Sequence, residues 1–222
     1  MNVLVISAHP DDETLGCGGT ILSHVACGDE VAWLILTRGT PPQFSAAQFA
    51  AAEKEVAAVS RAYGLRRHVW AELPATALDA VPLNDVIRSI REIIESTRPR
   101  IVYSVHHGDI HTDHRVVFDA TSVVLKAFYM RALGVERWLT FECLSSTDAA
   151  PQLAGRAFLP TVYRDISAQM ERKIEVMNLY RTQLQAAYMP RHESAIRALG
   201  RYRGASIGVE YAEAFALIRE VG

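Results

Sequence analysis

Residues 3–19, VLVISAHPDDETLGCGG, decide the fold of this chain. An apolar run leads directly into a histidine, two adjacent aspartates and a glycine-rich segment, and a short apolar run bounded by turn residues predicts a buried strand. Open α/β proteins place their chemistry where a strand ends in polar side chains and a helix begins. We therefore interpret His9, Asp11 and Asp12 as half of a metal site and expect the other half elsewhere in the chain.

The composition predicts a globular protein without a nucleic-acid or membrane partner. The 222 residues fit one large domain, and no repeat or linker divides them. Half of the residues are apolar and the formal net charge is −2, which gives no basic surface for nucleic acid. The three cysteines form no CxxC pair, and the N-terminus carries no signal-like or membrane-spanning segment. These features predict a cytoplasmic protein.

Strand and helix patterns alternate along the chain. Ser45 and Gln48 form a capping-box pattern, and Gly64 ends the helix that follows it. Residues 204–222 show no single pattern and stay unassigned. The predicted strands are 3–6, 30–36, 67–70, 101–105, 138–144 and 157–163, and the predicted helices are 14–26, 45–63, 84–97, 115–130, 167–185 and 190–202.

This alternation predicts an α/β fold with a mostly parallel sheet sandwiched between helices. Right-handed crossovers give the strand order 3-2-1-4, which places the first and fourth strands side by side. The residues that follow the fourth strand are 106–114, HHGDIHTDH. His111, Asp113 and His114 should therefore lie next to the first motif.

The combined set of side chains suits metal-assisted hydrolysis. A catalytic zinc ion takes three histidine or carboxylate ligands and keeps one position for water. A spare carboxylate can serve as general base, and a spare histidine can stabilise a developing oxyanion or protonate a leaving group. Together the two motifs contain three ligands and one spare group of each kind, a complete set for cleaving an amide or ester.

Three alternatives stay open from the residues alone. Asp11 and Asp113 also suit helix N-caps, where a carboxylate accepts from free N–H groups. Two histidines and one carboxylate are also the ligand set of non-haem Fe(II) oxygenases, so the metal is either zinc or iron. The third alternative is a metal-containing sugar-binding module without catalysis, in which the spare acid and base would have no use.

The two motifs also carry a family resemblance. His9-Pro10-Asp11-Asp12-Glu13 together with His111-Thr112-Asp113-His114 resembles the signature pair of the PIG-L/LmbE-like family of zinc-dependent de-N-acetylases. Residues 36–39, 180–183 and 208–215 also resemble that family's pattern, so the likeness extends over most of the chain. Gly16, Gly18 and Gly19 lack the GxGxxG spacing of a dinucleotide site, and close helix–sheet packing is their predicted role.

The resemblance implies a fold, a reaction and a role for each motif residue. It implies one Rossmann-like domain over 1–222 that removes the acetyl group from an N-acetylated amino sugar of the N-acetylglucosamine type, or from its conjugate. His9, Asp12 and His114 would bind Zn²⁺, and Asp11 would be the general base. His111 would assist at the carbonyl or the leaving amine, and Asp113 would orient His111.

One position departs from the resemblance. Relatives often carry an arginine early in the second helix, where this chain has Ala52, and Arg38 is the nearest substitute in sequence. The sequence leaves open whether Arg38, Arg137 or His192 contacts the substrate. It also leaves the oligomeric state open, although the apolar C-terminal helices would offer a surface for self-association.

Overall fold

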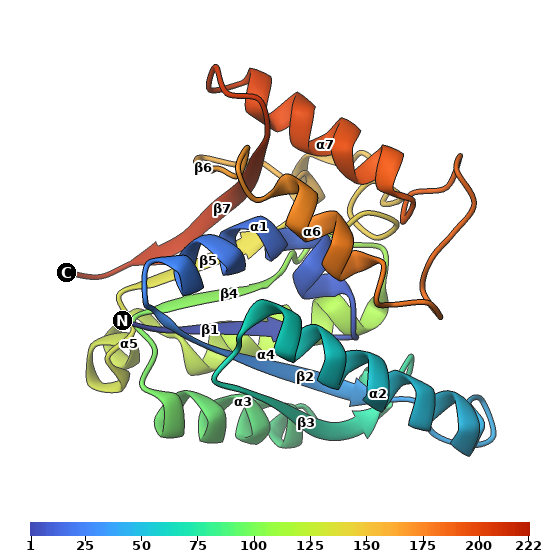
Figure 1. Cartoon of the computed structure of the whole chain (residues 1–222). Helices are drawn as coiled ribbons and strands as arrows, with labels where there is room; N and C mark the ends of the chain where they lie inside the picture. The colour runs from blue at the N-terminus through green and yellow to red at the C-terminus, as the bar shows by residue number, and fades with distance from the viewer.

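A seven-stranded sheet forms the centre of the computed structural model, which describes all 222 residues. Its strands are β1 (Asn2–Ser7), β2 (Glu30–Arg38), β3 (Arg67–Pro74), β4 (Ile101–Val105), β5 (Arg137–Phe141), β6 (Val162–Asp165) and β7 (Ala212–Glu220). The strand order is β3-β2-β1-β4-β5-β7-β6 (Figure 1). Strands β1 to β5 pair in parallel, whereas β7 runs antiparallel to both β5 and β6. The predicted 3-2-1-4 order and the mostly parallel sheet are confirmed.

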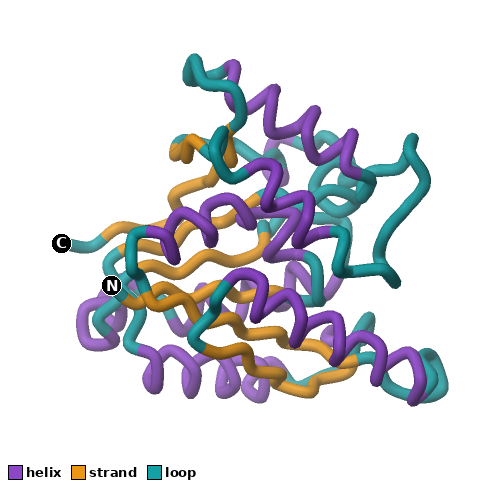
Figure 2. Tube along the Cα trace, in the orientation of Figure 1, coloured by secondary structure: helices purple, strands orange, loops and turns teal.

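Helices cover both faces of this sheet, as the tube view shows (Figure 2). The helices are α1 (Asp12–Ala26), α2 (Ala46–Tyr63), α3 (Leu83–Thr97), α4 (Thr112–Val124), α5 (Ala127–Leu133), α6 (Met170–Met177) and α7 (Glu193–Ala205). Helices α1, α2 and α6 cover the near face in Figure 1, α3, α4 and α5 lie on the far side, and α7 packs beside β7. The result is a single α/β domain.

Several element boundaries differ from the sequence prediction, and four of the differences are substantial. The predicted helix 115–130 is two helices, α4 and α5, and the predicted strand 138–144 ends at Phe141. The predicted strand 157–163 is shorter and shifted, as β6. The predicted helix 167–185 is the shorter α6, and beyond its end Tyr180 turns inward and donates its hydroxyl to the buried Glu13 carboxylate at 2.6 Å. The chain then runs as a loop to α7.

The unassigned C-terminal segment contains β7, a strand between β5 and β6. Its first four residues, Ala212 to Phe215, are all buried, and the later ones are only partly covered. A strand that passes from full to partial burial has no regular alternation, which explains why its pattern could not be assigned.

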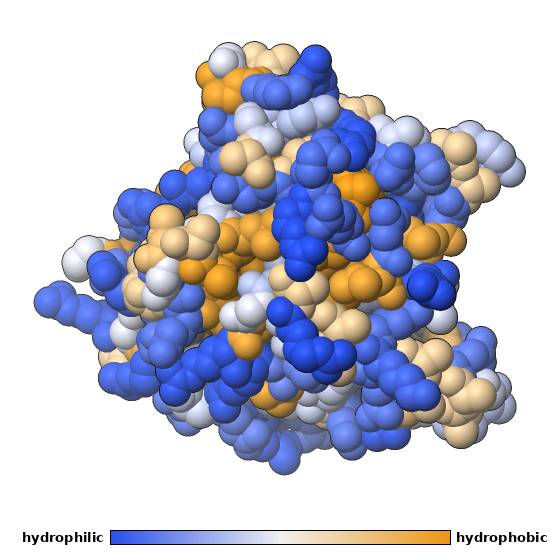
Figure 3. Space-filling model, in the orientation of Figure 1, coloured by the Kyte–Doolittle hydropathy of each residue, from blue (hydrophilic) through white to orange (hydrophobic).

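The surface of the protein is mainly hydrophilic, as the composition predicts for a globular protein. Hydrophilic side chains cover most of the face shown in Figure 3, and hydrophobic residues are seen mainly across its middle. None of the helices combines the length and the apolar character needed to cross a membrane.

Helix α1 lies unusually close to the sheet. A Cβ atom on Gly16 would lie 2.0 Å from the Phe141 ring, so only glycine allows this approach. The helix is also kinked at Cys17, whose φ of −144° and ψ of 22° are not helical. The predicted packing role of the glycines is confirmed at Gly16, and the approach holds the first turn of α1 against the end of the sheet.

A buried ion pair satisfies the backbone at this kink. Glu213 accepts hydrogen bonds from the N–H groups of Gly19 (2.8 Å) and Thr20 (2.7 Å). Lys173 donates to the Leu15 carbonyl at 3.0 Å, the group that the Gly19 N–H would contact in an uninterrupted helix. The two charged side chains lie 2.7 Å apart and are each 4% exposed. They therefore replace the hydrogen bonds that the kink removes.

The substitution Glu213→Ala tests this arrangement. It leaves the Lys173 ammonium and two N–H groups buried without their partner, so the free energy of unfolding should fall by about 3–5 kcal/mol in chemical denaturation. Glu220→Ala, on the same strand but in an exposed pair with Arg137, serves as the control and should change stability far less. A loss below about 1 kcal/mol for Glu213→Ala would contradict the assigned role.

Candidate metal centre

The two sequence motifs meet at one edge of the sheet. Strands β1 and β4 pair in parallel from Val3 with Ile101 to Ile6 with Ser104, so the loops that follow them are neighbours. The ligand-type atoms of His9, Asp12 and His114 lie within 4.8 Å of one another. His111 and Asp113 lie beside them, since they form a second such group with His9. The structure thus brings together the residues predicted to hold the metal.

His114 is fixed by a carboxylate that the sequence analysis did not single out. Its Nδ1 lies 2.7 Å from Asp109 Oδ2, and Asp109 in turn accepts the Thr147 hydroxyl at 2.6 Å. This contact leaves His114 Nε2 facing Asp12 Oδ1 at 3.3 Å. A buried carboxylate behind the ring is the usual way to set the orientation and basicity of a metal-binding histidine.

His9 is held in the same manner by Asp113. Its Nε2 lies 2.9 Å from Asp113 Oδ2, while its Nδ1 lies 3.8 Å from Asp12 Oδ2. The Asp113 carboxylate also accepts the backbone N–H groups of Thr76 (2.7 Å) and Leu78 (3.1 Å). The nitrogen of His9 that faces Asp12 is therefore Nδ1, and the carboxylate behind this ring comes from α4.

The predicted contact between Asp113 and His111 is made by the backbone and not by the carboxylate. The Asp113 N–H donates to His111 Nδ1 at 3.2 Å, while its side chain is occupied by His9 and the two amides. The suggestion that Asp113 caps α4 is also wrong, because His111 is the N-cap. Asp113 therefore contacts His111 through its backbone N–H, while its side chain orients His9.

Asp12 is ionised in this setting. Burial opposes its charge, but His114 and His9 more than offset that effect and lower the pKa of the carboxyl below its ordinary value. Its side chain also accepts the His9 N–H at 2.8 Å and the Cys143 thiol at 3.4 Å. Two histidines and a charged carboxylate whose ligand atoms converge form a donor set that suits Zn²⁺ or Fe(II).

Asp11 occupies the N-cap position of α1 without capping it. No side-chain hydrogen bond joins it to the helix, and its φ of 96° lies in the left-handed region, at a cost of about 1–3 kcal/mol for a non-glycine residue. Its carboxylate instead accepts from Arg191 Nη1 at 3.1 Å. Burial raises the pKa of Asp11 well above its ordinary value, and the charge of Arg191 opposes that shift. The backbone strain thus turns this side chain away from the helix.

The buried Glu13 carboxylate stabilises the strained backbone at Asp11. Its Oε2 accepts the Asp11 N–H at 3.2 Å, and its Oε1 accepts the hydroxyls of Thr14 (2.5 Å) and Tyr180 (2.6 Å). Burial raises the pKa of Glu13 to about 7 despite these bonds. The carboxylate after the two aspartates therefore supports the backbone and does not face the metal ligands.

His111 is a neutral hydrogen-bond donor beside the ligands. Its ring centroid lies 4.3 Å from that of His9 and 5.3 Å from that of His114. Burial and these two histidines lower the pKa of His111 to about 4, so the ring is uncharged near neutral pH. Because Nδ1 accepts the Asp113 N–H, the hydrogen of the neutral ring is on Nε2.

A cavity of about 450 Å³ is lined by the motif residues His9, Asp11, Asp12, His111 and His114. Arg191, from the loop between α6 and α7, is the one arginine or lysine among its lining residues. It donates to Gln183 Oε1 at 2.7 Å and to Ser145 Oγ at 3.1 Å in addition to Asp11. No motif surrounds Arg191 in the sequence, and the only signal was its place next to His192, one of the residues left open as a substrate contact.

The three residues left open as substrate contacts lie elsewhere. Arg38 pairs with Glu72 at 3.3 Å and covers the Phe49 ring at 3.7 Å. Arg137 pairs with Glu220 at the start of β5, the strand end remote from the cavity. The His192 ring accepts from the Ser194 N–H and caps α7. None of the three lines the cavity.

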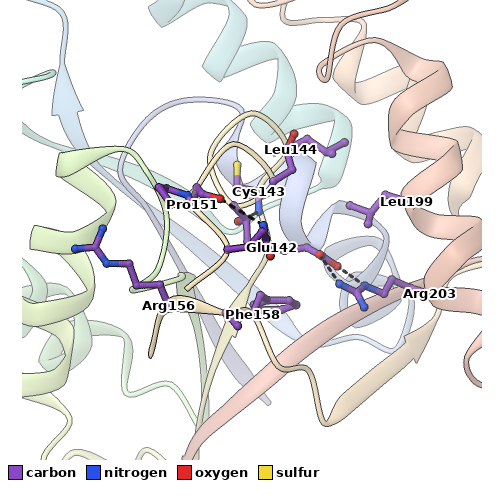
Figure 4. Close-up of a pocket in the computed structure, with 13 residues that line it drawn as sticks. Glu142, Cys143, Leu144, Pro151, Arg156, Phe158, Leu199 and Arg203 are labelled. Carbon is purple, nitrogen blue, oxygen red and sulfur yellow. Dashed lines mark hydrogen bonds and ion pairs between the residues drawn. The ribbon is translucent and has the colours of Figure 1, made fainter. Parts of the chain in front are cut away.

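A second, smaller cavity of about 190 Å³ shares Cys143 and Leu144 with the first (Figure 4). Glu142 and Arg203 line it and form two hydrogen bonds of 2.7 Å with each other. Arg156 points away from this pair in Figure 4. Because the partly buried Glu142 and Arg203 neutralise each other and no ligand-type cluster lies there, metal chemistry belongs to the first cavity.

The contacts of His114 predict proton release on metal binding. Burial by itself lowers the pKa of this ring, but Asp12 and Asp109 raise it to about 10, so His114 is protonated at pH 7.5 without metal. A histidine binds a metal ion as the neutral ring, so Zn²⁺ binding should release about one proton from this residue. Calorimetric titration in two buffers of different ionisation enthalpy measures that number, and Asp109→Asn should reduce it. Equal proton release by both proteins would contradict this ionisation state.

Comparisons with known proteins agree with this geometry. The PIG-L family model, described as GlcNAc-PI de-N-acetylase, matches residues 4–125. A Thermococcus kodakarensis diacetylchitobiose deacetylase is 25% identical over 97% of this chain and 82% of its own length. An uncharacterized deacetylase of Escherichia coli K12, YaiS, is 28% identical over 63% of this chain and 77% of its own.

A solved structure extends the likeness over the whole fold. The conserved protein TT1542 from Thermus thermophilus superposes with a TM-score of 0.79 and 29% identity, covering 99% of this chain and 96% of the other. The family match spans more than half of the chain and includes both motifs, at residues 9–13 and 111–114. The chain therefore belongs to the PIG-L (LmbE-like) family of GlcNAc-PI de-N-acetylases, whose members are amidohydrolases.

Proposed function

We propose that this protein is a zinc-dependent hydrolase that removes the N-acetyl group from an amino sugar of the N-acetylglucosamine type or from its conjugate. The observation that carries the proposal is the convergence of His9, Asp12 and His114 on one point, with the spare carboxylate of Asp11 in the same cavity. The names of the related deacetylases support the reaction class. The substrate within that class is our inference.

His9 Nδ1, Asp12 and His114 Nε2 would hold the zinc ion. The fit rests on the donor set itself and on the carboxylates that fix both rings, Asp113 for His9 and Asp109 for His114. When bound, zinc supplies a Lewis acid and a water whose pKa falls to about 7.

The remaining residues would carry the proton and the developing charge. Asp11 would accept the proton of the attacking water and pass it to the amide nitrogen as the bond to the acetyl carbon breaks, releasing acetate and a free amine. The neutral His111 would donate its Nε2–H to the carbonyl oxygen as negative charge develops there. Arg191 would hold the Asp11 carboxylate in position through its bond to Oδ2.

If Asp11 is the general base and not a metal ligand, replacing it should abolish most of the activity without loss of zinc. Asp11→Asn keeps the size of the side chain but cannot accept the proton, so acetate release should fall by about 10²–10⁴-fold. Zinc content, measured by elemental analysis, should stay at one ion per chain. Asp119→Asn, an exposed aspartate on α4, is the control and should retain activity. Full activity of Asp11→Asn would remove Asp11 from the mechanism.

A substrate screen tests the proposed reaction directly. Acetate release should be measured for a panel of N-acetyl sugars with the protein as purified, after removal of metal by a chelator, and after return of Zn²⁺. We expect activity that is lost with the metal and restored by zinc. Binding of these sugars without turnover would favour a binding module, and iron in the protein together with oxygen uptake would favour an oxygenase.

A further inference from the structure

One part of the metal cavity is an uncharged aromatic wall, which we define as Phe44, Phe49, Ala52 and Trp70. Phe44 comes from the loop before α2, Phe49 and Ala52 from α2, and Trp70 from β3. The rings of Phe49 and Trp70 pack edge to face with centroids 5.8 Å apart. All four side chains line the cavity and are only partly buried, so they present apolar area that the protein itself does not cover.

The charged side chains that line the cavity already have partners within the protein. The aspartates of the cavity are the two in the metal motif, and its one arginine, Arg191, is engaged by Asp11, Gln183 and Ser145. Arg38 covers the Phe49 ring but pairs with Glu72 and does not line the cavity. A phosphate or carboxylate on the substrate would therefore find, among the residues that line the cavity, no cation without a carboxylate partner.

The hydroxyl groups near the wall are also engaged. Thr37 donates to the Ala8 carbonyl at 2.7 Å, and Thr76 donates to Gln43 at 2.8 Å. A second sugar needs several hydrogen-bond partners for its hydroxyls, and of Thr37, Thr76 and Gln48 only the Gln48 side-chain NH2 is left without a partner in the protein. An apolar ring needs no such partners and gains from both area burial and edge or face contacts with Phe49 and Trp70.

We propose that the aromatic wall is an aglycone subsite that selects N-acetylamino-sugar glycosides with an uncharged aromatic aglycone. This inference rests on the proposed function, because the wall is continuous with the cluster that would cleave the acetamide. The acetamide would lie at His9, Asp12 and His114, and the aglycone ring would lie against the wall. The wall thus sets specificity, while the metal cluster sets the reaction.

Two measurements on the zinc-loaded protein test the subsite. The first compares kcat/KM for acetate release from 4-nitrophenyl N-acetyl-β-glucosaminide, free N-acetylglucosamine, N-acetylglucosamine 1-phosphate and diacetylchitobiose. The second compares the calorimetric Kd of 4-nitrophenyl glucosaminide with that of glucosamine, which needs no turnover. We expect the aryl compound to be favoured by about tenfold or more in both, the value of one aromatic contact with area burial.

Matched variants show whether the wall causes that preference. Phe49→Ala should reduce the aryl preference toward onefold, whereas Phe128→Ala, an exposed phenylalanine on α5, should leave it unchanged. Ala52→Arg keeps α2 intact and adds a cation to the wall, so it should lower the aryl preference and improve the 1-phosphate. Because Ala52→Arg removes no packed ring, it still tests the subsite if Phe49→Ala perturbs folding.

The outcomes separate the subsite from the reaction. No acetate from any sugar, with the aryl glucosaminide still bound tightly and dependent on Phe49, would remove the proposed function and keep the subsite as a binding site. Acetate release that is equal for all four sugars, or fastest with the 1-phosphate or with diacetylchitobiose, would overturn the subsite and leave the proposed function standing. An aryl preference that survives both Phe49→Ala and Ala52→Arg would also overturn it.

Discussion

The parallel pairing of β1 with β4 is the constraint on which the site depends. These two strands are separated by about a hundred residues, yet their register places Ile6 beside Ser104 and starts both following loops at the same edge. The first loop supplies His9, Asp11 and Asp12, and the second supplies the remaining histidines. Because the strands are buried on both faces, their register is strongly specified, and the geometry of the cluster follows from it.

The side chains of the cluster are held by buried carboxylates. Asp113 fixes His9 and Asp109 fixes His114, so each ring presents one nitrogen to Asp12 and has the other nitrogen occupied. Removing either carboxylate would free a ring to rotate, and in the low dielectric of the interior it would also leave a polar atom unpaired. These buried carboxylates therefore limit the rotation of the two imidazole rings.

The turn that carries Asp11 and Asp12 is also held in place by buried polar partners. The left-handed backbone conformation of Asp11 is sterically strained. Glu13 stabilises it by accepting the Asp11 N–H, and Arg191 stabilises it by donating to the Asp11 carboxylate. Farther along α1, Glu213 and Lys173 satisfy the backbone at the kink. Strain in the turn and buried charge beneath the helix are both tolerated because partners from the C-terminal half of the chain meet them.

The fold and the motif residues could be predicted from the sequence, whereas the supporting contacts could not. Alternating strands and helices constrain the topology to few choices, and ligand-type residues at strand ends mark a site without any coordinates. Asp109 and Arg191 act through contacts at long range or in irregular loops, which no periodicity records. Tyr180 illustrates the limit: its spacing fits a continuing helix, but its hydroxyl is drawn inward to Glu13, and the helix ends.

The central claim is that His9, Asp12 and His114 form the metal site. A second group, His9, His111 and Asp113, has its ligand-type atoms within the same 4.8 Å and offers the direct alternative. Anomalous diffraction at the zinc edge from zinc-loaded crystals distinguishes the two. We predict one peak bonded to His9 Nδ1, Asp12 and His114 Nε2, with Asp113 retained on His9 Nε2. A peak bonded to His111 and Asp113 would contradict the account, because the neutral donor and the ring-orienting carboxylate would then be ligands.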